Sequence, residues 1–99
     1  MKYKISGNIT SDKESLFTVS EILDAVVLMG YDKSIYMHAN SPKGRIVIHR
    51  NLDGSYVVEV QYSACYFLKP VKLNEINSLI STPLELIDDP EKYGFKWYE

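Results

Sequence analysis

The stretch YMHANSPKGRIVIHR, residues 36–50, holds both histidines of the chain, two arginines and a Ser-Pro-Lys-Gly segment. Pro and Gly at this spacing are typical of a turn between two strands. On both sides of the segment, apolar residues alternate with polar ones, which is the pattern of half-buried strands. The stretch therefore predicts a β-hairpin with strands at 34–40 and 45–50.

A four-residue turn over 41–44 would set the register of this hairpin. It places Ala39 opposite Ile46 and Met37 opposite Ile48, so that the apolar side chains share one face. In this register His49 lies opposite Tyr36, and His38 lies diagonally across. The second face then carries a set of polar and aromatic residues, Tyr36, His38, Arg45 and His49.

The segment after the hairpin, Asn51-Leu52-Asp53-Gly54, admits two registers. A two-residue Asp-Gly turn would turn Glu59 and Gln61 toward the core. A three-residue loop with a left-handed Gly54 instead places Ile48 opposite Val58 and keeps both apolar faces together. We therefore expect the bulged hairpin, followed by a long strand from Tyr56 to about Phe67 that has room to bend near Ser63.

The flanking segments supply the remaining elements. Residues 2–9 alternate, with lysines on the polar side, as in many edge strands. Thr18 and Glu21 form a capping-box pattern before a helix over about 19–29. A second helix places Leu73, Ile76, Leu79 and Ile80 on one stripe. Thr82-Pro83 and Glu85 predict a second capping box and a short helix through Ile87.

Together these elements predict one α+β domain over residues 1–99. Its order is β-α-β-β-β-α, with helices packed on a mainly antiparallel sheet of four strands. Residues 95–97 would add a fifth strand if they pair with the sheet.

Composition restricts the functional classes. The formal net charge is −2, which disfavours binding of nucleic acid through bulk positive charge. The longest apolar run, residues 25–29, is far shorter than a membrane span, and the N-terminal residues contain no signal-peptide core. The single Cys65 excludes an internal disulfide and fits a reducing compartment. We therefore expect a cytoplasmic protein that does not bind membranes.

The sequence contains no catalytic or cofactor motif, so we expect no enzyme and no cofactor. Cys65 lies among apolar residues, as a buried structural thiol would. The two histidines alone fall short of the three or four ligands of a zinc site, and no metal site is predicted. Ser41–Gly44 with Arg45 and Arg50 is a candidate phosphate site, but the same residues are ordinary turn chemistry. The alternative prediction is a surface that binds a small ligand or a metal ion, formed by Tyr36, His38, Arg45 and His49.

The α-β-β-β-α order resembles that of double-stranded-RNA-binding modules. The resemblance is limited to topology, because such modules contact phosphates with lysines in the last helix. Here Asn74 and Glu75 stand near the start of the second helix, and Glu85, Asp88 and Asp89 follow. A weak RNA-binding module therefore stays a further alternative.

The most suggestive segment is the C-terminal one, which is both acidic and aromatic. Residues 81–99 carry five carboxylates against two lysines, whereas residues 1–80 carry nine basic and eight acidic side chains. Tyr and Trp are the residues that most often anchor protein interfaces, and carboxylates attract basic partners. We therefore expect a non-enzymatic domain that binds another, basic protein, as an inhibitor or immunity-type protein that blocks a toxin or other enzyme. The expected contact residues are Asp88, Asp89, Glu91, Tyr93, Trp97 and Tyr98.

Overall fold

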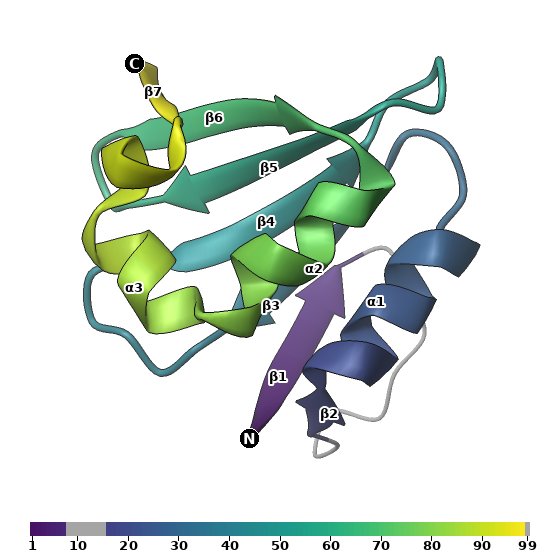
Figure 1. Cartoon of the computed structure of the whole chain (residues 1–99), viewed down its shortest axis with the longest axis horizontal. Helices are drawn as coiled ribbons and strands as arrows, with labels where there is room; N and C mark the ends of the chain where they lie inside the picture. Colours follow the sequence, from purple (N-terminus) through teal and green to yellow (C-terminus); the bar gives the residue numbers. More distant parts are fainter. Residues whose placement is uncertain (8–15, 99) are drawn as a thin grey trace.

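Alternating apolar and polar residues build an antiparallel sheet in the computed structural model, which describes residues 1–7 and 16–98 (Figure 1). In these residues the strand order is β2-β1-β3-β4-β5-β6-β7. The strands are β1 (Lys2–Gly7), β2 (Phe17–Thr18), β3 (Lys33–His38), β4 (Arg45–Arg50), β5 (Tyr56–Gln61), β6 (Tyr66–Val71) and β7 (Lys96–Tyr98). The helices are α1 (Val19–Leu28), α2 (Leu73–Ser81), α3 (Pro83–Asp88) and the 3-10 helix η1 (Pro90–Tyr93).

The predicted α+β class and antiparallel sheet are confirmed, but the number of strands and the element order are wrong. The sheet has seven strands in place of four or five. Strand β2 has only two residues, too few to show an alternating pattern. Strand β1 is also not an edge strand, because it pairs with both β2 and β3. The predicted end of this strand, at residues 8 and 9, lies outside the described residues.

The hairpin of β3 and β4 forms, but its register differs from the prediction by two residues. Met37 pairs with Ile46 and Ile35 pairs with Ile48. Strand β3 ends early, at His38, because Asn40 adopts a left-handed conformation with φ 58°. A shift of two residues preserves the faces, so the apolar side chains still lie together. The shift does, however, change the cross-strand partner of His49 from Tyr36 to Ser34.

The hairpin of β4 and β5 confirms the bulged alternative. Ile46 pairs with Val60 and Ile48 pairs with Val58. Gly54 has φ 88°, a conformation that favours glycine, and its N–H donates to the carbonyl of Asn51 at 3.0 Å.

The predicted long strand from Tyr56 to Phe67 is two strands. A tight turn over 62–65 separates β5 from β6, closed by a hydrogen bond of 2.9 Å from the Tyr62 N–H to the carbonyl of Cys65. The apolar run after the turn pairs back on β5, with Phe67 opposite Val60. Cys65 therefore lies in a turn and is partly exposed, so the expectation of a buried thiol is wrong.

Helix α1 begins as its capping box predicts. The Thr18 hydroxyl accepts the Glu21 N–H at 3.1 Å, and the Glu21 carboxylate accepts the Thr18 N–H at 2.9 Å. At the other end, Arg50 donates to the carbonyl of Met29 at 2.8 Å. Its guanidinium also lies over the rings of Tyr31 and Tyr56, at 4.6 and 5.3 Å. Arg50 thus caps a helix, which favours the structural role over the phosphate role.

Helices α1, α2 and α3 all lie on one face of the sheet (Figure 1). Helix α2 buries the predicted stripe, Ile76, Leu79 and Ile80, while Leu73 stays partly exposed. Pro83 opens α3 as expected, but the Thr82 side chain makes no capping hydrogen bond. Thr82 is at the same time the C-cap of α2, with φ −127° and ψ 64°, and the Glu85 carboxylate that would complete the box accepts from the Tyr93 hydroxyl at 2.9 Å. The core between helices and sheet includes the fully buried Ile22, Val26, Ile35, Met37, Ile46, Ile48, Val58, Ile76, Ile80, Leu86 and Ile87.

Candidate functional site: the open sheet face and the C-terminal surface

The second face of the sheet carries no helix of the described residues, and we call it the open face. Because side chains alternate along a strand, every second residue of each strand lies on the open face, and the residues between them face the helices and the core. Tyr36 pairs with Val47, Val47 with Glu59, and Glu59 with Leu68, so these residues cross the middle of the face in one row. The four residues of the predicted ligand face also lie on it, namely Tyr36, His38, Arg45 and His49.

A carboxylate lies buried at the centre of the open face. Glu59 is 7% exposed, and its neighbour Val47 is fully buried, although the helices of the described residues lie on the other face of the sheet (Figure 1). The Glu59 carboxylate accepts from Gln61 Nε2 at 3.3 Å and contacts His49 Nε2 at 2.8 Å. A buried carboxylate is tolerated where hydrogen bonds replace its hydration. The side chains on this face therefore cover one another as a polar layer.

His49 is held at both ring nitrogens. Its Nδ1 lies 2.7 Å from the Ser34 hydroxyl, and its Nε2 lies 2.8 Å from Glu59. The imidazole thus lies between a hydroxyl and a carboxylate, and each of its nitrogens has one hydrogen-bonding partner. This chain of serine, imidazole and carboxylate fixes the orientation of His49 and leaves neither nitrogen open to a metal ion.

His38 has a different environment. Its Nε2 lies 3.0 Å from the Ser6 hydroxyl, and its cross-strand neighbour is Lys4. Burial lowers the pKa of His38 from its ordinary value of 6.5, and the positive charges of Arg45 and Lys4 lower it further. His38 is therefore mainly neutral at pH 7, within a cationic corner of the open face.

Tyr36 and Arg45 form a stacked pair beside this corner. The Arg45 guanidinium carbon lies 4.5 Å from the centre of the Tyr36 ring, and its Nε donates to the Gln61 side chain at 2.6 Å. Stacking on an aromatic face and a planar hydrogen bond are both typical of arginine. The predicted ligand face is thus assembled on one surface, but its two imidazoles bind different serines and do not form one site. No group of three or more His, Cys, Asp and Glu side chains suited to a metal ion occurs within residues 1–7 and 16–98.

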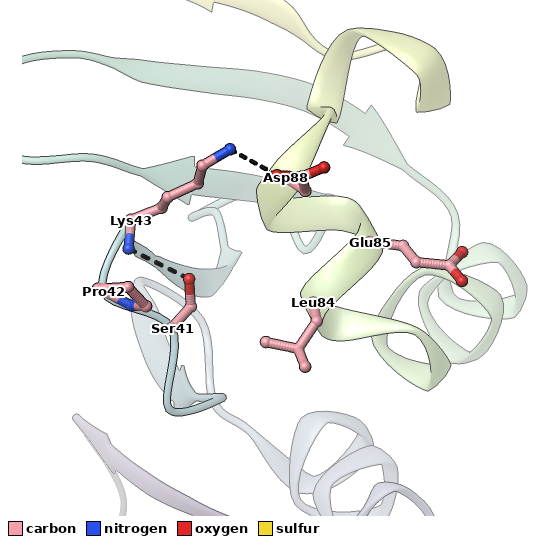
Figure 2. A pocket seen from close by; sticks show the side chains of 6 residues that line it. All are labelled: Ser41, Pro42, Lys43, Leu84, Glu85 and Asp88. Carbon is pink, nitrogen blue, oxygen red and sulfur yellow. Dashed lines mark hydrogen bonds and ion pairs between the residues drawn. The ribbon is translucent and has the colours of Figure 1, made fainter.

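The turn between β3 and β4 lies opposite α3 (Figure 2). Figure 2 shows Lys43 reaching across to Asp88, where the ammonium and carboxylate are 2.5 Å apart. This ion pair raises the pKa of Lys43 and lowers that of Asp88. Both side chains are exposed, so the pair is screened by water and contributes little to stability. A groove of about 430 Å³ lies between the two elements, lined by Ser41, Pro42, Lys43, Leu84, Glu85 and Asp88.

The predicted acidic and aromatic residues lie along three consecutive elements, α3, η1 and β7. We call this the C-terminal surface, made of Asp88, Asp89, Glu91, Tyr93, Trp97 and Tyr98. Asp89 and Glu91 are exposed, whereas Tyr93 is partly buried. Trp97 and Tyr98 are 57% and 56% exposed on β7, and Tyr98 stacks on Tyr66 at 5.3 Å. Phe95, by contrast, is buried in the core.

Sequence reasoning missed four participants in these surfaces: Lys4, Ser6, Ser34 and Gln61. Their positions in the alternating pattern could have indicated them, because each lies on the same face of the sheet as a histidine or Arg45. The Lys43–Asp88 pair had no signal of this kind, since 45 residues separate its members. Only the packing of α3 beside the turn brings them together.

Comparison with models of protein families, with curated proteins and with solved structures found no match to this chain. Within the described residues, no helix combines the length and the hydrophobicity needed to cross a membrane.

Proposed function

We propose that this chain is a non-enzymatic, cytoplasmic protein-binding domain, of the inhibitor or immunity type, and that it binds its partner through the C-terminal surface. The observation that carries the proposal is the exposure of Trp97 and Tyr98, 57% and 56%, on an edge strand. Large aromatic side chains that become buried against a partner are common anchors of protein–protein interfaces. Two adjacent ones on one short strand therefore favour a docking surface.

The shape of the edge supports the same proposal. β7 is the last strand in the sheet order, so its outer edge pairs with no strand of the described residues. An unpaired edge offers backbone N–H and C=O groups to a strand of another protein. Because Trp97 and Tyr98 point to opposite sides of β7, such a partner could contact one ring on each face.

Charge supports a basic partner. Asp88, Asp89 and Glu91 are exposed in the segment that precedes β7, and among the described residues only Asp88 of the three forms an ion pair, with Lys43. Enzymes that act on nucleic acids carry basic grooves, and an acidic surface of this kind would attract and block such a groove. This is the reason for preferring a toxin or nuclease as the partner of a small acidic inhibitor.

The test is affinity capture from the organism's own cells with the double variant Trp97→Ala, Tyr98→Ala. We expect the wild-type chain to retain a protein, identifiable by mass spectrometry, and the double variant to lose at least about 2 kcal/mol of binding free energy toward it. Tyr31→Ala is the control, because Tyr31 is equally exposed, at 57%, but follows α1 and is not part of the C-terminal surface. Equal affinities of the double variant and the wild type would contradict the proposal.

A further inference from the structure

A second hollow, separate from the C-terminal surface, opens on the other side of the β3–β4 turn. Its volume is about 410 Å³, within the range of small-molecule pockets. It is lined by His38, Ser41, Pro42, Lys43, Gly44, Arg45, Gln61, Tyr62 and Ser63. Gly44 shapes its floor, since a Cβ at this position would lie 2.3 Å from the carbonyl oxygen of Gln61. The Tyr62 hydroxyl donates to the Ile87 carbonyl and so ties one wall of the hollow to α3.

Basic side chains from separate elements meet at this hollow. Lys43 and Arg45 come from the turn and β4, and His38 comes from β3. Lys4 of β1 adds a fourth basic side chain as the cross-strand neighbour of His38. Within the described residues, the Arg45 guanidinium makes no hydrogen bond besides the one from Nε to Gln61. Its terminal N–H groups therefore keep their capacity to donate.

These charges repel one another. Arg45 and Lys4 lower the pKa of His38, in addition to the effect of burial. Asp88 already pairs with Lys43, and Glu59 contacts His49, so Arg45 is the charged lining residue of the hollow for which no carboxylate partner is found among the described residues. A bound anion would relieve the repulsion between the charges of Arg45 and Lys4, and it would favour the protonated form of the otherwise neutral His38.

We propose that this hollow binds the phosphoryl group of a small phosphate ester, with Arg45 as its main ligand. Arginine matches the geometry of phosphate oxygens with two parallel N–H donors. The hydroxyls of Ser41 and Ser63, which line the hollow, supply further donors. A small ester is favoured over a nucleic acid because a long polyanion that extended toward α3 would meet the carboxylates of Asp88, its last residue, and Asp89, its C-cap. The volume leaves room for an organic group beside the phosphate.

The test is NMR titration of the full chain with inorganic phosphate, with adenosine monophosphate and with a short single-stranded RNA, at constant ionic strength. We expect phosphate and the monophosphate to shift the His38 ring and Arg45 Nε–H signals, with saturation by about 20 mM for a millimolar site. Arg45→Gln should weaken the affinity about tenfold, and Lys4→Gln about threefold. Lys33→Gln is the matched control, since it removes the same charge at the opposite end of β3 and should leave the affinity unchanged.

Three results would overturn the proposal. The first is the absence of shifts at His38 and Arg45 with both phosphate and the monophosphate. The second is an equal loss of affinity in Lys33→Gln and Lys4→Gln, which would indicate attraction by overall charge alone. The third is binding of the RNA without binding of the monophosphate, which would point to a nucleic-acid surface. Because Lys4 is exposed, Lys4→Gln keeps the test valid even if Arg45→Gln fails to fold.

Discussion

At the scale of single residues, the two histidines show how one strand face gives the same side chain two different roles. His49 bridges Ser34 and Glu59 and is fixed in one orientation. His38, bonded to Ser6, stands among positive charges. The alternation of residues along β3 and β4 predicted that both imidazoles share a face, but which serine each one contacts depends on a register that sequence alone misplaced by two residues.

His38 gives a prediction about pH. Its pKa in the folded chain lies below the ordinary value of 6.5, so the unfolded chain takes up this proton first as the pH falls. The contribution of His38 to the free energy of unfolding is therefore fully present above the unfolded pKa of 6.5. It is lost as the pH falls through the lower pKa of the folded chain. We expect His38→Gln to lose less unfolding free energy than the wild type between about pH 7.5 and pH 5.5.

Urea unfolding at the two pH values measures this difference. The carboxylates whose pKa values are lowered, such as Asp53 and Asp88, titrate below this range and are present in both proteins. Parallel losses of stability in the variant and the wild type would contradict the assigned environment of His38.

At the scale of elements, several local signals predicted the structure correctly. The capping box of α1, the bulged loop at Gly54 and the stripe of α2 all form as predicted. The failures have two physical causes, which are local backbone turns that the residue pattern did not reveal and one contact between separate elements. Asn40 ends β3 early, the turn over 62–65 divides the long strand, and Tyr93 holds the Glu85 carboxylate that would have capped α3.

The α1 cap gives a prediction about stability. Thr18→Ala removes the hydroxyl that accepts the Glu21 N–H, so we expect the free energy of unfolding to fall by about 1 kcal/mol. Ser20→Ala is the control, since Ser20 is exposed inside the same helix and alanine has the higher helix propensity. Chemical unfolding should show a loss for Thr18→Ala and none for Ser20→Ala. Equal stabilities of Thr18→Ala and the wild type would show that the cap is not needed.

At the scale of the whole molecule, the fold separates two charged surfaces at the β3–β4 turn. The cationic corner of the open face lies on one side of it, and the acidic C-terminal surface lies on the other. The Lys43–Asp88 pair marks the boundary between them. Sequence composition predicted the acidic end, because its residues are consecutive. It could not predict the cationic corner, whose members come from β1, β3, β4 and the turn and meet only in the folded sheet.

The acidic surface should govern how fast the partner binds. Reversing charge in the triple variant Asp88→Lys, Asp89→Lys, Glu91→Lys should slow association with a basic partner by about tenfold at low salt, with a smaller effect at high salt. The free energy of unfolding should change little, because all three side chains are exposed. Asp24→Lys is the matched control for Asp89→Lys, since it makes the same charge change on an exposed position of α1.

The most direct test of the proposed function is therefore the association rate constant of the triple variant with the protein that the wild-type chain captures, measured at low and high salt. The proposal predicts slower association that converges on the wild-type rate as salt increases, while Asp24→Lys stays close to the wild type. A triple variant that associates as fast as the wild type at low salt would contradict binding through the C-terminal surface.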